Sequence, residues 1–308
     1  MSNAIPLLEG TDGSGGYLVR DTYGSSLQAK IRRESAVLSV SRVDRVPGKR
    51  QRYTVYAGRP TAAFVAEGAA KPVTGAEFTE VQVNVKKIAT IVLYTEEILE
   101  DAVEDPRVLV NADVEAAFAD LIDAHSLGYA AGAAITGQFD SELTNTTSTR
   151  ELGTSADAFA LAVSGSMEAI EGNGNRPSAI VAASDVRAHL RDQRQSGSGL
   201  GVAQPVYTDG FGREPDTLYG LPIRYSSNLD AFPAAAGKVA ALVGDYSNSV
   251  FAMRRDLSVR GSTDATVDVS GTLHHLWQQN KVAIQWEMRI GFFAYDLNKN
   301  FDSITNAS

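Results

Sequence analysis

The alternation of apolar and polar residues predicts a long β-hairpin in the first third of the chain. Residues 51–57 are rich in β-forming side chains, and residues 78–94 alternate for most of their length. Glycine and proline interrupt the twenty residues between them, 58–77. A loop of that length is too long for a compact hairpin turn, and such loops are usually functional.

The loop of this hairpin carries an apolar stretch. Residues 62–66 read Ala-Ala-Phe-Val-Ala. An exposed apolar stretch in a globular protein indicates that another surface buries it. We therefore interpret the loop as a contact to another chain, with an ordinary surface loop as the alternative.

Helical patterns follow the hairpin. Thr95 and the two glutamates after it are typical of a capped helix start. Asp105 followed by Pro106 favours the start of a second helix, which we expect to run to about Ala131. At 1.5 Å per residue this helix would be about 39 Å long. That length suits an organising element better than the wall of an active site.

The second half of the chain mixes strands and helices. A buried strand at 178–183 between helices at about 156–171 and 184–194 indicates an α/β layer. The remaining expected segments are a helix or extended segment at 26–40, a polar loop at 132–156, a glycine-rich loop at 195–217, strands at 221–226, 238–243 and 249–253, an extended polar stretch at 256–272, and a mostly apolar strand within 276–295.

Composition describes a globular protein. Of the 308 residues, 44% are hydrophobic and 21% are charged, which excludes a disordered or fibrous chain. No apolar run approaches the roughly 18 residues of a membrane helix, and the N-terminus lacks the pattern of a secretion signal. Cysteine is absent, so disulfides and thiolate chemistry are excluded.

The net charge of -9 conceals an uneven distribution. Residues 1–60 carry a net charge of +5, residues 61–171 carry -14, and residues 172–308 are balanced. Oppositely charged segments can attract copies of the same chain. Two ordinary solvated faces are the alternative.

Motifs for catalysis are missing from the sequence. It has no phosphate-binding GxxxxGK[ST] loop, no HExxH and no G-x-S-x-G. His274 and His275 have no carboxylate at metal-ligand spacing, and the carboxylates at 96–105 fit a solvated helix face. We therefore expect no enzyme, no cofactor and no metal site.

Several short motifs follow one another over roughly residues 15–300. They are GGYLV at 15–19, AEGAAKP at 66–72, Phe78, VKKIA at 85–89, TEEILEDA at 95–102, GLP at 220–222, and the pair Glu287 and Arg289. In this order they resemble the motifs of tailed-phage major capsid proteins of the Hong Kong 97 fold.

The resemblance implies an α+β fold built around an extended β-hairpin loop and a long spine helix, with peripheral and axial domains. On this sequence the family's regions would be an N-terminal arm at 1–33, a peripheral domain with the spine helix at 34–50, 95–154 and 238–290, an extended loop at 51–94, and an axial domain at 155–237 and 291–308.

The resemblance also implies a function. Copies would self-assemble in the bacterial host cytoplasm into pentamers and hexamers, which form the icosahedral head of the virion around double-stranded DNA. The expected partners are other copies, a separate scaffolding protein, a portal and, where the phage has them, decoration proteins; DNA would be enclosed without sequence-specific binding, and no membrane is involved. The alternative is an encapsulin-type nanocompartment shell that holds enzyme cargo.

Some family members join subunits through a lysine–asparagine isopeptide bond, assisted by a glutamate. At the matching positions this chain has Lys71, Asn280 and Glu287. The lysine must lose its proton before it can attack the amide, and a nearby carboxylate can accept that proton. The alternative is that Lys71 forms an ordinary salt bridge while Asn280 and Glu287 serve the sheet.

Overall fold

A computed structural model describes most of the chain between residues 30 and 306. The described residues are 30–32, 34–58, 60–101, 106–130, 133–135, 137–152, 158–187, 190, 194–195, 204–205, 217–229 and 238–306. Most of the expected N-terminal arm, 1–33, and of the loop expected at 195–217 therefore lies outside the described residues.

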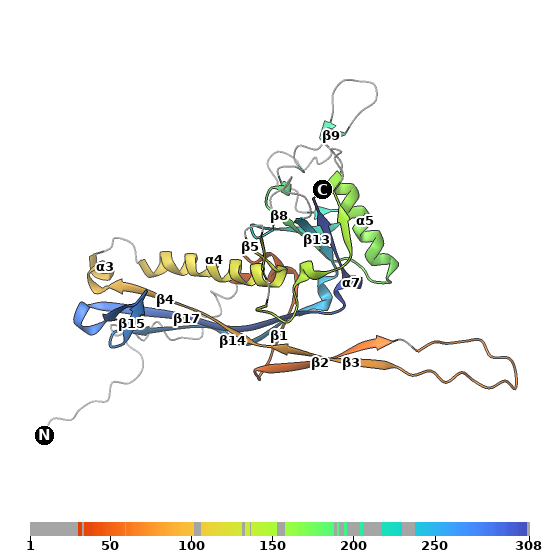
Figure 1. Ribbon diagram of the computed structural model, residues 1–308, viewed down its shortest axis with the longest axis horizontal. Helices are drawn as coiled ribbons and strands as arrows, with labels where there is room; N and C mark the ends of the chain where they lie inside the picture. The colour runs from red at the N-terminus through yellow and green to blue at the C-terminus, as the bar shows by residue number, and fades with distance from the viewer. Residues whose placement is uncertain are drawn as a thin grey trace.

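Four strands form an elongated sheet along the long axis of the molecule (Figure 1). Their order is β1-β14-β17-β4; β1 is parallel to β14, and the other neighbours are antiparallel. Their bounds are Arg42–Arg45 for β1, Ser249–Ser262 for β14, Lys281–Ala294 for β17 and Lys86–Thr95 for β4.

One face of this sheet is covered by the long helix α4, Pro106–Leu127 (Figure 1). Trp286 of β17 is buried on that side, and its Nε1 donates a hydrogen bond to Asn111 Oδ1 of α4 at 3.2 Å. Gln285, Glu287 and Arg289, which alternate with Trp286 along β17, are partly exposed. The alternation in this strand therefore reflects a sheet with one covered and one open face.

A six-stranded sheet forms the second lobe. Its order is β11-β12-β8-β13-β18-β7. The bounds are Thr217–Leu218 for β11, Leu221–Ser226 for β12, Ala179–Ala183 for β8, Val239–Gly244 for β13, Phe301–Thr305 for β18 and Thr149–Glu151 for β7. Every residue of β8 and β13 is buried, as expected of central strands.

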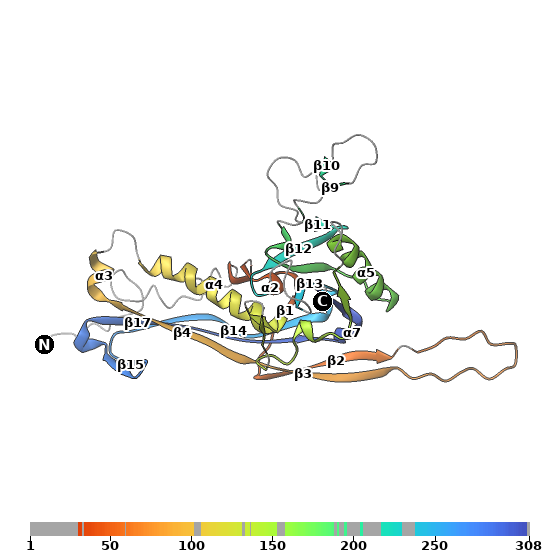
Figure 2. The same cartoon turned by 45° about the horizontal axis from the view of Figure 1, so that its top comes forward.

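Two helices pack on this second sheet. Helix α5, Ala158–Gly172, contacts β13 and β18. The short helix α2, Ala36–Val40, contacts β8 and β12 as well as α4, so it lies between the two lobes (Figure 2).

The expected hairpin is present but shorter than predicted. Strands β2, Arg50–Gly58, and β3, Glu77–Asn84, pair as an isolated ribbon that projects from the body (Figure 1). The prediction of one strand over 78–94 is wrong, because β4 leaves the ribbon and pairs with β17. The Val85 N–H is bonded to Lys49 O, and the Asn84 N–H is bonded to Asp140 Oδ2. These bonds divert the chain from one sheet into the other.

The helices after β4 begin and end at recognisable signals. Helix α3, Glu96–Asp101, starts where predicted, and Thr95 Oγ1 accepts a hydrogen bond from the Ile98 N–H at 3.4 Å. Helix α4 ends at Leu127 rather than near Ala131. Gly128 has a φ of +81°, a left-handed conformation that favours glycine and ends helices.

The polar stretch expected at 256–272 falls on three strands. Strand β14 continues to Ser262, and β15, Thr266–Val269, pairs with β16, Thr272–His275, as a short hairpin. The remaining elements are β5 Tyr129–Ala130, β6 Ala133–Ala134, β9 Arg194–Gln195, β10 Gln204–Pro205, α7 Leu297–Asn300 and 3-10 turns at η2 Leu143–Asn145, η3 Tyr246–Asn248 and η4 Trp277–Gln279. Within the described ranges, none of the helices has the length and apolar character that crossing a membrane requires.

Candidate assembly surfaces

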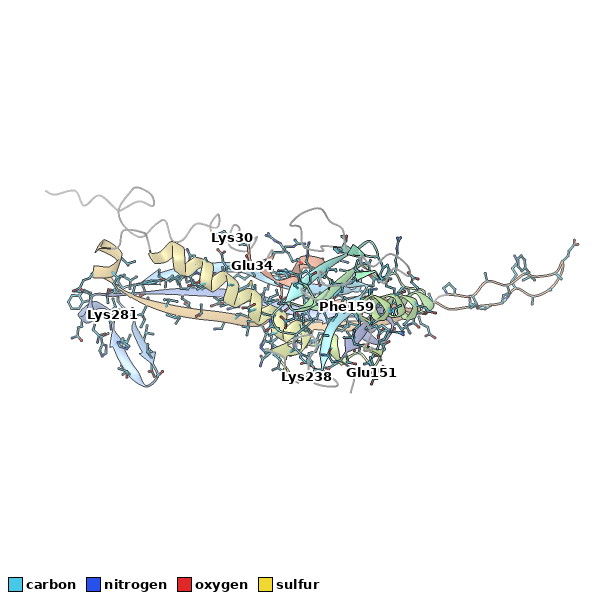
Figure 3. The ribbon with its side chains drawn as sticks, turned by 90° about the horizontal axis from the view of Figure 1, so that it is seen from above. Lys30, Glu34, Glu151, Phe159, Lys238 and Lys281 are labelled. Atoms are coloured by element: carbon cyan, nitrogen blue, oxygen red, sulfur yellow. The ribbon has the colours of Figure 1, made fainter. Side chains whose placement is uncertain are left out.

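The loop of the β2–β3 hairpin projects away from the rest of the chain (Figures 1 and 3). We call residues 60–76 the tip; all of them are exposed. Phe64 and Val73 are 110% and 99% exposed, the highest values among the large apolar side chains described. Lys71 lies in this tip. The chain's own body therefore leaves an apolar segment uncovered.

Asn280 lies at the opposite end of the molecule, next to Lys281, which Figure 3 labels. It ends η4 in a left-handed conformation with a φ of 45°, and its carbonyl accepts the Glu96 N–H at 2.8 Å. These features hold the backbone of Asn280 against the start of α3 while the residue itself remains exposed.

Glu287 lies on the open face of the four-stranded sheet. Arg289 Nε donates to Glu287 Oε1 at 3.0 Å. Arg289 is in register with Arg255 on one side and Lys87 on the other, so three cations cross the sheet in one row. Burial acts to raise the pKa of Glu287, but the hydrogen bond from Arg289 and the three positive charges together lower it below its ordinary value.

Within one chain the three residues do not meet. The tip and Asn280 are at opposite ends of the long axis (Figures 1 and 3). Asn280 directly precedes β17, and Glu287 lies within that strand, seven positions further on. At 3.3 Å per residue, the two residues are about 23 Å apart. A reaction centre with all three residues would therefore need more than one chain.

A buried carboxylate that the sequence did not single out joins the two lobes. Asp123 of α4 accepts hydrogen bonds from Ser35 Oγ at 2.6 Å and from the N–H groups of Ala36 and Val37 at 2.7 and 3.1 Å. Burial raises the pKa of Asp123 to about 6, although the three hydrogen bonds favour the charged form. The helix pattern marks Asp123 only as polar, so its partner 88 residues away in sequence was not predictable.

No cluster of three or more histidine, cysteine or acidic residues suited to a metal ion occurs in the part of the chain that the structure describes. His274 instead lies in a surface network. Lys281 Nζ is 3.1 Å from His274 Nδ1 and donates to Gln279 Oε1 at 3.0 Å.

Solved structures share this fold. A structure from Microbacterium phage Oxtober96 is 22% identical, with a TM-score of 0.69 over 88% of this chain and 91% of that one. A structure from Mycobacterium phage Adephagia is 17% identical, with a TM-score of 0.70 over 89% and 90%. A chain described as the capsid of a native GTA particle gives a TM-score of 0.63 at 15% identity over 89% and 91%. The mixed α+β architecture is therefore the Hong Kong 97 type expected from the sequence.

The sequence comparisons agree with the fold. The capsid polyprotein of Pseudomonas phage PAJU2 is 26% identical over 239 residues, which is 74% of this chain and 35% of that protein. The chain thus spans about a third of the length of this curated relative. The family model described as "Phage capsid family" matches residues 15–298 of this chain. The resemblance to phage capsid proteins is confirmed, and the chain is a structural protein that belongs to the phage capsid family.

Proposed function

We propose that copies of this chain assemble into pentamers and hexamers that form an icosahedral phage head around double-stranded DNA. The observation that carries the proposal is the isolated β2–β3 ribbon with its uncovered apolar tip. Such a ribbon gains stability only when another surface covers the tip. The tip reaches beyond its own body (Figure 1), so a neighbouring copy is the available surface.

The uneven charge supports the same proposal. The basic segment 1–60 of one copy would lie near the acidic segment 61–171 of another. Each exposed ion pair contributes only about 0–1 kcal/mol, but a shell repeats every pair many times. The net charge of -9 also limits binding to packaged DNA, since binding is driven by neutralising phosphates.

In this proposal the regions expected from the family keep their roles. Residues 1–33 act as the arm, α4 acts as the spine of the peripheral domain, and the six-stranded sheet forms the axial domain. Assembly in the host cytoplasm would use a separate scaffolding protein, a portal and, in some phages, decoration proteins.

Replacing the tip by a short turn tests the shell. The variant should fold as a monomer or capsomer but form no closed particles, as followed by sedimentation and electron microscopy. Closed particles of normal size from the shortened chain would contradict the proposal. Nucleic acid inside wild-type particles supports a phage head, whereas enzyme cargo would support the encapsulin-type alternative.

We further propose an isopeptide crosslink between Lys71 and Asn280. The Lys71 Nζ lone pair forms a bond to Asn280 Cγ, the Cγ–Nδ2 bond breaks, and the proton lost by Nζ leaves with Nδ2 as ammonia. Glu287 would carry that proton. A glutamate is already ionised at neutral pH, so Glu287 can accept a proton there, but its lowered pKa makes it a weaker base than an ordinary glutamate.

The proposed centre would draw on three subunits. The tip supplies Lys71 from one copy, and the separation along β17 prevents one copy from supplying both Asn280 and Glu287. A neighbour would therefore supply Glu287.

Denaturing gels of mature particles test the crosslink. The wild type should give a covalent ladder, Lys71→Arg and Asn280→Asp should give only monomer, and the control Lys281→Arg should retain the ladder. Free monomer alone in the wild type would contradict the crosslink. Mixed particles of Asn280→Asp and Glu287→Gln chains test the number of subunits. They should regain a ladder, because each chain supplies what the other lacks; monomer alone would assign both residues to one copy.

A further inference from the structure

We propose that Tyr246 and Asp123 form a lock between the two lobes. The hydrogen bond from the Tyr246 hydroxyl to the Asp123 carboxylate is open in the single chain and closes when neighbouring copies turn one lobe against the other. The inference rests on the proposed assembly of copies into a shell. It adds a conformational change within each copy and names the two side chains that stabilise the changed form.

The hydroxyl of Tyr246 is buried without a partner. Tyr246 lies in η3 and is 0% exposed, and its hydroxyl makes no hydrogen bond to any residue that the structure describes. Buried hydroxyls are nearly always paired, because an unpaired one costs the full free energy of its desolvation. A second arrangement of the chain that pairs this hydroxyl explains why it is kept.

Asp123 is an acceptor within electrostatic reach of this hydroxyl. Burial, and after it the charge of Asp123, raise the pKa of Tyr246, so the phenol stays protonated and able to donate. Of the carboxylate oxygens, Oδ1 accepts from Ser35 Oγ and the Val37 N–H, and Oδ2 accepts from the Ala36 N–H. One carboxylate oxygen can accept two hydrogen bonds, so Oδ2 has room for the Tyr246 hydroxyl.

The two side chains belong to different lobes. The Tyr246 N–H donates to Ser178 Oγ, just before β8, at 2.9 Å. The Tyr246 ring packs edge-on against Phe301 of β18, with ring centroids 5.2 Å apart. Tyr246 is thus fixed to the six-stranded lobe, whereas Asp123 is part of α4, which covers the four-stranded sheet. A turn between the lobes therefore changes the separation of the hydroxyl and the carboxylate.

The chain crosses between the lobes next to this pair. Ser41, between α2 and β1, and Ser249, at the start of β14, are joined through their hydroxyls at 2.7 Å. A third crossing runs from β17 to α7, and its Tyr295 N–H donates to Asn248 O at 3.1 Å. This crossing contains Asp296 with a φ of 43°, a left-handed conformation that strains a residue other than glycine. Three neighbouring crossings define an axis about which the lobes can turn.

Contacts between copies supply the turn. The β2–β3 ribbon continues directly into β4 of the four-stranded sheet, so a neighbour that holds the tip also holds this lobe. The six-stranded lobe then adjusts to its own neighbours. A partner shifts a conformational equilibrium only when it binds one form more tightly than the other. The closed lock adds one hydrogen bond to the form that fits the shell.

Tyr246→Phe removes only the hydroxyl and should act with opposite signs in the two states. In the unassembled chain it removes an unpaired buried group, so the urea midpoint of unfolding should stay equal or rise. In particles it removes a bond to a charged acceptor. The equilibrium constant for release of chains in urea, followed by sedimentation, should therefore rise roughly tenfold to a hundredfold. A lower midpoint in the unassembled chain, or unchanged release from particles, would overturn the lock.

A second substitution identifies the acceptor. With Asp123→Asn in place, the effect of Tyr246→Phe on release should shrink, because a hydrogen bond to a neutral amide is roughly half as strong as one to a carboxylate. The control Tyr219→Phe removes the hydroxyl of a tyrosine that is 55% exposed, and it should change neither unfolding nor release. An equal effect of Tyr246→Phe with and without Asp123→Asn would assign the bond to another acceptor and overturn the pairing.

Ultraviolet Raman spectra test the lock without reference to stability. The tyrosine bands report whether a phenol donates a hydrogen bond. The difference between the wild type and Tyr246→Phe isolates Tyr246 among the 11 tyrosines of the chain. Its hydroxyl should be unbonded in the unassembled chain and a donor in particles. Identical bands in the two states would contradict the proposed change.

The outcomes separate the lock from the proposed function. Closed particles in which the Tyr246 bands and the effect of Tyr246→Phe match those of the unassembled chain would retain the shell and overturn the lock alone. A wild-type chain that forms no particles would overturn both.

Discussion

The two lobes of this protein use their sheets differently. In the six-stranded sheet, β8 and β13 are buried at every position, and α5 and α2 pack on the strands. In the four-stranded sheet, α4 covers one face, while Ile91, Glu287 and Arg289 lie on the other, which is open. The six-stranded lobe buries its central strands within one chain. The four-stranded lobe leaves one face of its sheet open.

The largest expected effect compares the same substitution in the two lobes. Ile180 of β8 is fully buried, whereas Ile91 of β4 is 49% exposed. Ile180→Ala should lower the free energy of unfolding by about 2–5 kcal/mol because it leaves a cavity. Ile91→Ala should change it by less than about 1 kcal/mol in the unassembled chain. Denaturant unfolding measures both, and equal losses would remove the distinction between the lobes.

The joint between the lobes should respond to pH. The pKa of Asp123 is raised to about 6 from 3.8 by burial, so the folded state binds this proton more tightly than the unfolded state. Its contribution to stability is fully present below pH 3.8 and is lost as the pH rises through 6. The loss amounts to up to about 3 kcal/mol.

Asp123→Asn should lack this part of the pH dependence. Unfolding of both proteins between pH 4 and pH 7 measures the difference in slope. Parallel pH profiles would show that the hydrogen bonds from α2 fully compensate the burial of Asp123.

Gly291 of β17 packs against Asn84, the last residue of the hairpin strand β3, and this contact should leave no room for a side chain at position 291. A Cβ there would lie 2.6 Å from the backbone oxygen of Asn84. Gly291→Ala should therefore destabilise the chain by about 1–3 kcal/mol, as overpacking does. The control Gly172→Ala, at the end of α5, meets nothing within 4 Å and should be neutral or slightly stabilising. Thermal unfolding of both variants checks this, and a neutral Gly291→Ala would mean that the ribbon moves freely.

The smallest effect is expected on the open face. Arg289→Gln removes the hydrogen bond and the nearest charge that lower the pKa of Glu287, so that pKa should rise. The stability of the chain should change by less than about 1 kcal/mol, because the pair is partly exposed. Side-chain NMR titration measures the pKa; an unchanged value would assign the lowering to Lys87 and Arg255.

Local patterns predicted the closed lobe well. Strand 221–226 has the predicted bounds, and the helix expected at 156–171 is α5 within two residues at its start. These elements are specified by their own apolar periodicity. The open lobe was harder, because alternation over 78–94 shows that a strand exists but not that its partner changes at Val85.

The candidate sites show the same limit. The exposed tip followed from its apolar sequence. Lys71, Asn280 and Glu287 came from the resemblance, and no local pattern could show that the fold holds them far apart. The exposure of Trp277 and the burial of Asp123 depend on contacts between distant segments, and residue type alone favours the opposite for each.

The attachment of the hairpin to Asp140 has a consequence for how copies fit together. Asp140 accepts hydrogen bonds from both the backbone N–H and the Nδ2 of Asn84, at 2.6 and 2.9 Å, so it fixes the direction in which the ribbon leaves the body. At about 3.3 Å per residue, the sixteen steps from Asn84 to Gly68 would span up to about 50 Å if fully extended. A tilt of about 5° at this point would carry the loop sideways by about 4–5 Å over that length. The carboxylate of Asp140 thus helps to set the direction of the β2–β3 ribbon. Small changes in that direction would let identical chains join at different angles in a curved surface.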